Sequence, residues 1–250
     1  MNSTSITEAI QTMQNHRTVR HYEKEPIPRE HIKNILLAGQ GAASSNFVQA
    51  YSIIHVTDAE LKETIIQYAN NKQQITECSD FFIFCADFKR LQVAGKMHHV
   101  DIKHEEVENL LVATVDATLI AQNVMMAAES LGYGGCYIGG IRNNPAPLSE
   151  LLQLPELVFP LFGMTLGIPA EQNDVKPRLP LEAIVHENRY DANKYVELLP
   201  AYDETMNQYY QNRTANSKDL NWSKSMANFL KEEKRMHMKK FLEDKGFNLK

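Results

Sequence analysis

Apolar positions along the chain fall into two patterns, a helical period in the longer segments and continuous short runs in the others. Helical spacing predicts a first helix over 4–16 and a third one over 58–71. Between them it predicts a second helix that begins at Pro28 and ends where small residues follow, from Gly39 to Ser45. Short runs predict strands over 51–57, 80–88 and 158–169, and a strand entering a glycine turn over 134–141. Because 80–88 is apolar almost throughout, it is typical of a central, buried strand.

The longest helical pattern covers 105–132 and is apolar on nearly every face around Val112 to Met126, so we expect it to run through the core. Gly132 is its expected C-cap. Thr4 or Ser5 are N-cap candidates for the first helix, and Asp58 for the third.

The hydrophobic pattern of the sequence changes near Pro177, where the helical period is lost. An extended, proline-punctuated segment over 176–190 is followed by two helical patterns over 197–213 and 222–246. Neither a linker nor a repeat interrupts the chain. We therefore expect a single α+β domain over 1–250, whose tail from about 177 packs lightly on the body or wraps a partner subunit.

Composition and net charge disfavour several classes of protein. Hydrophobic residues make up 43% and charged residues 23%, and the net charge is −5, which disfavours binding to nucleic acid or an anionic membrane. No apolar run approaches the roughly 20 residues of a membrane span, and the N-terminus has no export signal, so we expect a cytoplasmic protein. Cys78, Cys85 and Cys136 lack metal-ligand spacing and are expected as free thiols, the last two in the core.

Four segments carry residue types suited to an anionic cofactor, since they offer cations, hydroxyl and amide donors, or glycine backbone. Each has an ordinary alternative: basic residues satisfy a helix end, a glycine pair makes a turn, and the other two are solvated loops. No segment decides between the readings alone. The residues are His16, Arg17, Thr18 and Arg20; Ser44, Ser45 and Asn46; Gly139 and Gly140; and Lys176 and Arg178.

The order of these motifs resembles the flavin-dependent nitroreductase family, in its NADPH-preferring flavin reductase and oxygen-insensitive nitroreductase branch. The matching stretches are HRTVRHY, AASSNFVQAYSII, FFIFCADF, AQNVMMAAESLGYGGCYIGGIRNN, LPLFGMTLGIPA and DVKPRLP, and they cover nearly the whole chain. The resemblance implies a nitroreductase-like α+β fold with a central, mostly antiparallel sheet flanked by helices. It also implies FMN bound non-covalently at the interface of a homodimer, interlocked through extended terminal segments.

For the phosphate end of FMN, the resemblance implies contacts from His16 and Thr18, joined by Lys176 and Arg178. Arg17 belongs to the same motif, but its direction stays open. Arg20 is expected beside the flavin ring, where a fixed cation favours the reduced, anionic form and raises the reduction potential.

For the rest of the cofactor, the resemblance implies that Ser44, Ser45 and Asn46 line the ribityl chain or the ring edge. Tyr137 and Ile138 lead into Gly139 and Gly140, where glycine allows the backbone to approach the flavin closely. A family glutamine near NNKQQ falls on Lys72 in an ungapped match. Either Gln73 takes its role after a small loop shift, or Lys72 adds a cation.

The loop YYQNRTANSKDLNW matches the family's segment for the 2′-phosphate of NADPH, which points to Arg213 and Lys218. The histidine-rich insertion with His98, His99 and His104 has no rigid ligand spacing, so we expect a solvated loop and no metal.

The resemblance implies an FMN-dependent NADPH oxidoreductase with ping-pong kinetics, reducing nitroaromatics, quinones or free flavins. The flavin carries the chemistry, and no protein acid or base is expected. Two alternatives stay open: a disulfide, chromate or azo reductase of the same fold, and a flavin-binding carrier or sensor without efficient turnover. The sequence leaves the physiological acceptor open.

Overall fold

The computed structural model describes residues 6–212, 221–248 and 250. The chain forms two compact units, one of Met1–Asn173 with Arg235–Lys250 and the other of Asp174–Lys234. Each is described by itself.

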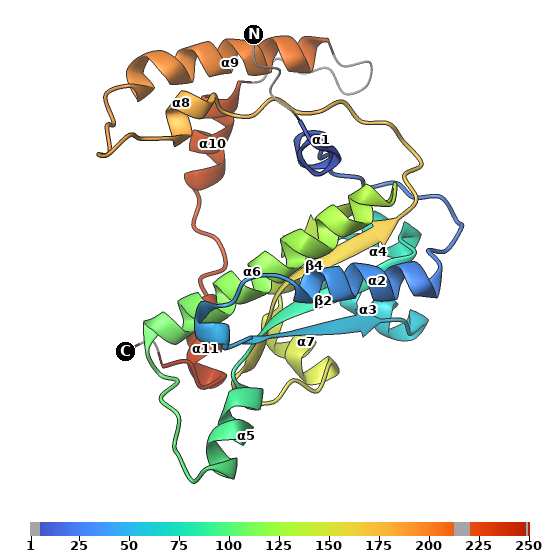
Figure 1. Ribbon diagram of the computed structural model, residues 1–250, viewed down its shortest axis with the longest axis vertical. Helices are drawn as coiled ribbons and strands as arrows, with labels where there is room; N and C mark the ends of the chain where they lie inside the picture. Colours follow the sequence, from blue (N-terminus) through green and yellow to red (C-terminus); the bar gives the residue numbers. More distant parts are fainter. Residues whose placement is uncertain (1–5, 213–220, 249) are drawn as a thin grey trace. The chain divides into compact units, whose positions relative to one another are not determined.

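A four-stranded antiparallel sheet organises the first unit (Figure 1). Its order is β1 (Tyr51–Val56), β2 (Asp80–Asp87), β4 (Val158–Gly167) and β3 (Gly134–Ile138). All four predicted strands are therefore confirmed, and β2 is buried along its whole length.

Alternation along β2 divides the core into two layers. Phe82 and Phe84 point to the apolar cluster on one face of the sheet, whereas Phe81 and Ile83 point to the cluster on the other. A strand covered on both faces has no need of polar positions, which is why this sequence is a continuous apolar run.

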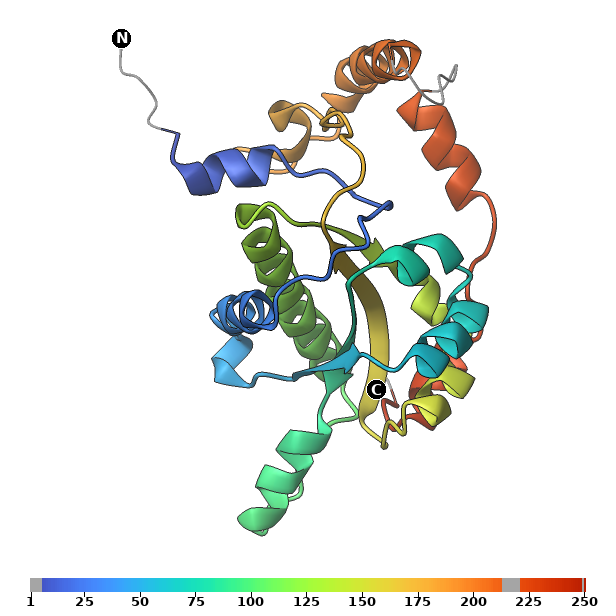
Figure 2. The same ribbon diagram turned by 90° about the vertical axis from the view of Figure 1, so that its right-hand side faces the viewer.

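Helices cover both faces (Figure 2). On one face lie α2 (Arg29–Gln40) and α6 (Val107–Ser130). On the other lie α3 (Ala59–Ala69), α4 (Lys72–Glu77) and α7 (Pro145–Leu151). The sequence did not predict α4 or α7, because each spans fewer than two full turns of amphipathic pattern.

The long helix α6 is buried on one side only. Its inner face packs on α2 and the sheet, but Leu111, Val115 and Leu119 are 54%, 52% and 40% exposed. The expectation that α6 runs through the core holds for its inner face and is wrong for this outer apolar stripe. The C-cap of α6 is Leu131, so the expected Gly132 is wrong by one residue; Gly132 comes directly after the cap, with a left-handed φ of +84°.

Among the described residues, α6 is also long and apolar enough to cross a membrane, with a mean hydropathy of 1.5 in its most apolar window. This corrects the expectation that no segment approaches that length. The inner face of α6 packs against the sheet, as in the core helix of a globular protein.

The first helix, α1 (Glu8–Gln14), begins later than predicted. Thr7 is its N-cap and accepts a hydrogen bond from the backbone of Ile10 at 3.4 Å. The candidates Thr4 and Ser5 lie outside the described residues.

The C-terminal segment returns to the first unit. Instead of one helix over 222–246, the structure has α10 (Trp222–Leu230) and α11 (Met238–Asp244). Phe241 and Phe247 of the returning end are buried against Phe159, with Phe247 and Phe159 ring centroids 5.1 Å apart. The break lies in the stretch 231–237, KEEKRMH, in which five of the seven residues are lysine, arginine or glutamate.

The second unit consists of α8 (Leu181–Ile184), α9 (Tyr195–Gln211) and α10. Asp203 of α9 accepts a hydrogen bond from the backbone N–H of Ser223 at 2.8 Å, which fixes the start of α10.

Candidate functional site

The basic segment lies beside the strand that leads into the predicted glycine turn, although over a hundred residues separate them in the chain. Thr18 pairs with Gly135 in a parallel bridge, and the Val19 N–H donates to the Gly135 carbonyl at 3.0 Å. The backbone of Ala170 donates to the carbonyl of His21 at 3.0 Å. The basic segment 16–22 thus lies beside the start of β3, whereas the glycine turn follows the other end of this strand.

Buried side chains hold this segment in place. Val19 and Tyr22 are core residues, and the Tyr22 hydroxyl donates to the Val19 carbonyl at 2.7 Å and lies 2.7 Å from the Thr165 hydroxyl. Burial raises the pKa of Tyr22, so it stays a neutral hydrogen-bonding group. With these two side chains anchored, the polar residues between them are left at the surface.

His16 is oriented by a residue that sequence reasoning missed. Its Nδ1 lies 2.6 Å from Oε1 of Glu129, in the last turn of α6. This contact occupies one ring nitrogen and leaves Nε2 for another partner. The only sequence signal for Glu129 is its place in the matching stretch AAESLG.

Arg17 has a buried Nε without a hydrogen-bond partner among the described residues. Together with Glu129 it lines a cavity of about 740 Å³ bounded by α1, the end of α6 and the segment after β4. The unsatisfied donor marks this part of the cluster as suited to an acceptor.

Arg20 is exposed and lies near β3. Burial raises the pKa of the Cys136 thiol, and the Arg20 charge opposes that rise. Arg20 acts in the same way on Tyr22. Its charge therefore stands close to the strand that leads into the glycine turn.

The glycine turn forms η2 (Gly139–Arg142) directly after β3. A Cβ on Gly140 would lie 2.1 Å from the Ala69 carbonyl oxygen and 2.3 Å from Oδ1 of Asn71, so the chain itself requires glycine there. A Cβ on Gly139 would meet its nearest neighbour only at 3.8 Å. Packing within the chain therefore does not require glycine at position 139.

A second arginine pair surrounds this turn and was not predicted. Arg142 donates to the carbonyl of Leu161, the extra residue at the bulge in β4. Arg235 donates to the carbonyl of Gly139 at 2.9 Å and to Oδ1 of Asn143 at 3.1 Å. Burial, and then the charge of Arg235, lower the pKa of Arg142. Arg235 reaches the glycine turn because residues 235–250 return to the first unit. No local sequence pattern predicts this position.

Tyr137 and Ile138 face opposite sides of β3. The Tyr137 hydroxyl donates to Gln122 at 3.3 Å, and burial followed by the charge of Glu129 raises its pKa to about 12. Ile138 is buried in the core, so it can offer a ligand only its backbone.

The serine loop leads into η1 (Ser45–Phe47), and α6 holds it in place. The Ser44 hydroxyl donates to Oδ2 of Asp116 at 2.7 Å and accepts from the backbone of Gln49 at 2.8 Å. Asn46 has a φ of 46°. The Ser44 hydroxyl is thus already engaged within the chain, whereas its role toward a flavin stays a prediction.

Position along α6 separates the predicted residues into two groups. The serine loop contacts Asp116, and His16 contacts Glu129, thirteen residues further along the helix. At 1.5 Å per residue this is about 20 Å. Within one chain, the serine loop and His16 therefore cannot meet at the same phosphate.

Gln73 and Lys72 both lie on α4 and are exposed. The Gln73 side chain lies 3.0 Å from Nδ1 of His21 and donates to Glu77 at 3.1 Å. Gln73 therefore neighbours the basic segment.

Lys176 and Arg178 belong to the second unit, where Lys176 Nζ lies 5.4 Å from the centre of the Tyr210 ring. The Tyr202 hydroxyl donates to the Pro177 carbonyl at 2.9 Å, which ties the segment to α9. Arg213 and Lys218 lie outside the described residues.

The histidine-rich insertion is a largely exposed loop after His98, as expected. It begins at the end of a helix the sequence did not predict, α5 (Lys89–Met97), whose C-cap is His98. His104 lies with its Nδ1 3.2 Å from the Gly246 carbonyl. Across the residues that the structure describes, no cluster of three metal-ligand side chains occurs.

The basic segment and the glycine turn together fit an anionic, planar cofactor. The segment supplies cations and an unsatisfied Arg17 donor, and packing within the chain does not explain the glycine at position 139. This donor chemistry suits the phosphate and ring edge of FMN.

Comparison with protein families agrees with this geometry. Residues 13–168 match the nitroreductase family, and residues 176–250 match the nitroreductase family C-terminal domain.

Individual relatives match over almost their entire length. A "CR(VI) reductase" from Pseudomonas sp. (strain G-1) is 54% identical, covering 95% of this chain and 98% of the relative. An "FMN reductase (NADPH)" from Bacillus subtilis (strain 168) is 40% identical, covering 97% and 99%. The solved structure of the NfrA1 nitroreductase from B. subtilis superposes with a TM-score of 0.92 at 39% identity, covering 96% of this chain and 99% of that one. The predicted α+β fold is thus confirmed, and the chain belongs to the nitroreductase family.

Proposed function

We propose that this protein is an FMN-dependent NADPH oxidoreductase that reduces nitroaromatics, quinones, free flavins or related acceptors. The observation that carries the proposal is the pairing of the basic segment 16–22 with the start of β3, the strand that leads into the glycine turn. Relatives that match over nearly the full chain are named "FMN reductase (NADPH)" and "Oxygen-insensitive NADPH nitroreductase", which supports the same activity.

His16 and Thr18 bind the FMN phosphate, joined by Lys176 and Arg178. The contact with Glu129 supports this role for His16, since it fixes the ring and leaves Nε2 free. Nε2 can donate to the phosphate when both ring nitrogens carry a proton. Arg17 adds a donor whose Nε has no other partner among the described residues. Several cations on one phosphate give short, charge-assisted hydrogen bonds.

Bound FMN supplies the redox chemistry, taking a hydride from NADPH and passing electrons to the acceptor. The residues of the chain supply placement and charge. Arg20 stands beside the ring and favours its reduced, anionic form, while the backbone at Gly139 and Gly140 and the side chain of Gln73 hold the ring edge.

We further propose that the working form is a homodimer in which the serine loop of one copy completes the site of the other. The outer apolar stripe of α6, Leu111, Val115 and Leu119, supports a subunit contact.

Arg213 and Lys218 bind the 2′-phosphate of NADPH in this proposal. We also propose a cytoplasmic location, supported by three buried, free cysteines.

A second candidate function is chromate reduction, favoured by the 54% identity to a protein named "CR(VI) reductase". Both functions use the same flavin, so only the acceptor differs.

The test is steady-state oxidation of NADPH by the purified, FMN-loaded protein with a nitroaromatic, a quinone, free FMN or chromate as acceptor. We expect turnover with several acceptors, because an open flavin face is sterically permissive. Tight FMN binding without NADPH oxidation by any acceptor would contradict the proposal and favour a flavin carrier or sensor.

A further inference from the structure

The serine loop is held in a strained backbone conformation. Asn46, Phe47 and Gln49 have φ values of 46°, 58° and 53°, although none of them is glycine. A bulky residue such as Phe47 rarely adopts this region. Phe47 is also 79% exposed, so packing of its own side chain does not stabilise the conformation. Something else must hold the loop.

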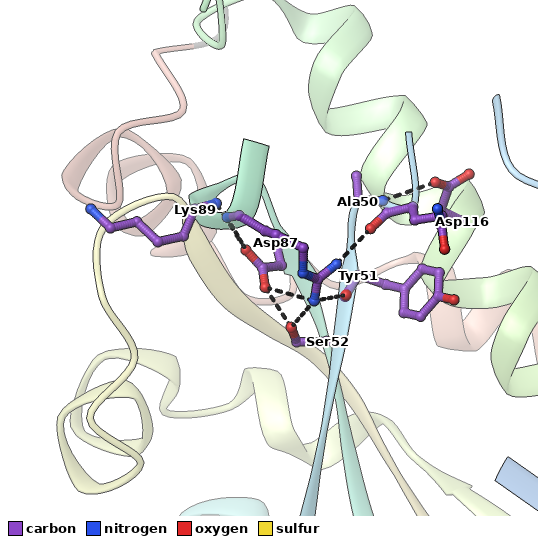
Figure 3. Close-up of polar contacts among 8 residues, drawn as sticks. Ala50, Tyr51, Ser52, Asp87, Lys89 and Asp116 are labelled. Atoms are coloured by element: carbon purple, nitrogen blue, oxygen red, sulfur yellow. Dashed lines mark hydrogen bonds and ion pairs between the residues drawn. The ribbon is translucent and has the colours of Figure 1, made fainter. Parts of the chain in front are cut away.

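A buried carboxylate provides that hold. Asp116 is 1% exposed in the middle of α6 and accepts three hydrogen bonds, all from the loop or its end. Its Oδ1 accepts from the Ser45 N–H at 3.2 Å, and its Oδ2 accepts from the Ser44 hydroxyl at 2.7 Å and the Ala50 N–H at 3.0 Å. The last contact is drawn in Figure 3.

Asp116 forms no salt bridge with the cations that the structure describes. A buried charge is tolerated only when hydrogen bonds replace its lost water. The carboxylate and the loop therefore depend on each other: the loop donors satisfy the charge, and the charge fixes both ends of the strained turn.

A second clamp acts from the solvent side. The Arg90 guanidinium donates to the carbonyls of Gln49 and Tyr51 at 3.0 and 3.1 Å. Asp87 orients this region by accepting from the Ser52 hydroxyl and from the backbone of Lys89 at 2.8 Å (Figure 3). The chain leaving the loop is thus held from inside by Asp116 and from outside by Arg90.

We propose that Asp116 is a positioning residue for the flavin site: it holds the loop 44–50 in the conformation that presents Ser45 and Asn46 to the cofactor. This inference rests on the proposed function, and it adds a residue that touches neither FMN nor substrate. A flavin contact on a loop is effective only if the loop is already in place when the cofactor arrives, because ordering it later would cost affinity.

Asp116→Asn tests the proposal with almost no change in shape. Both carboxylate oxygens accept from a backbone N–H, so either orientation of the amide turns its NH₂ group against a donor. We expect faster hydrogen exchange at Ser45 and Ala50, and a dissociation constant for FMN raised by roughly tenfold. The Michaelis constant for the acceptor should rise with it, while that for NADPH changes less.

Asp80→Asn is the matched control. Asp80 is also buried, and it accepts from Ser79 and lies 2.8 Å from His55 at the other end of β2. We expect this variant to lose stability while exchange at Ser45 and Ala50 and the affinity for FMN stay those of the wild type.

If Asp116→Asn does not fold, Arg90→Ala tests the same role of the loop. The side chain of Arg90 is exposed, so its removal leaves the core undisturbed. It should give a smaller rise in the FMN dissociation constant. Faster hydrogen exchange at Ser45 and Ala50 in either variant, together with wild-type FMN affinity and acceptor kinetics, would overturn the proposal. Failure of the wild type to bind FMN would instead remove the proposed function and this inference with it.

Discussion

Gly139 and Gly140 are adjacent, yet the chain constrains only one of them. A Cβ at Gly140 would collide with the Ala69 carbonyl, whereas a Cβ at Gly139 would make only ordinary contacts, with guanidinium nitrogens of Arg142 and Arg235 at 3.8 and 3.9 Å. The sequence presents them as an equivalent pair, and only the structure separates a glycine that packing requires from one that it does not.

This difference predicts opposite outcomes for two alanine substitutions. Gly140→Ala should destabilise the fold by about 1–3 kcal/mol, because the backbone of α3 must move. Gly139→Ala should unfold at the wild-type temperature but bind FMN more weakly. Thermal unfolding and FMN fluorescence quenching measure the two effects. Equal FMN affinity in Gly139→Ala and the wild type would remove the proposed flavin contact there.

Arg20 and His16 should also behave differently, because we propose that Arg20 lies beside the flavin ring and His16 binds the phosphate. Arg20→Ala should lower the reduction potential of bound FMN by roughly 30 mV, which is about 1.4 kcal/mol for a two-electron couple. His16→Ala should weaken FMN binding and leave the potential near its wild-type value. Spectroelectrochemistry gives the potentials, and an unchanged potential in Arg20→Ala would reduce the cluster to a simple anion site.

The three cysteines should be unreactive in the native protein. Burial raises the pKa of Cys78 and of Cys85 to about 12 and also raises that of Cys136. A raised thiol pKa keeps the neutral form dominant at pH 8, and only the thiolate is nucleophilic. We expect no reaction with an aromatic disulfide reagent until denaturant is added. Rapid labelling of the native protein would show that a thiol reaches solvent. It would then favour the alternative that the protein reduces disulfides through a thiol.

At the scale of elements, continuous apolar runs and long amphipathic periods were sufficient to predict every strand of the sheet and the helices α2, α3 and α6. Short helices such as α4, α5 and α7 escaped because they are too brief for a period to emerge. The break between α10 and α11 escaped as well, since charged residues with good helix propensity fill it.

The helix α6 yields a prediction of its own. Its outer stripe repeats every four residues through Leu111, Val115 and Leu119, and a carboxylate there would be buried in any subunit contact. Val115→Asp should therefore convert a dimer to a monomer and greatly reduce FMN retention, with little loss of monomer helicity. Light scattering after gel filtration gives the mass. A wild-type chain that is itself monomeric, or a variant that stays dimeric, would contradict the role of this stripe.

At the scale of the whole molecule, the site depends on contacts that no local pattern encodes. The residues of the basic segment were predicted from the resemblance, but Glu129, Asp116 and Arg235 were not. Each of these acts through a tertiary contact formed by the fold, between a helix or returning tail and a loop distant in sequence. Family motifs identify the residues proposed to touch the cofactor, whereas the residues that orient them become visible only in three dimensions.

The proposed activity requires that the protein binds FMN and that the bound FMN accepts a hydride from NADPH. Anaerobic titration of the purified, FMN-loaded protein with NADPH, followed by the visible absorbance of the flavin, measures this directly. We predict complete bleaching at about one NADPH per bound FMN, followed by recovery of the colour on adding a quinone. A protein that retains FMN but keeps its colour in excess NADPH would contradict the account.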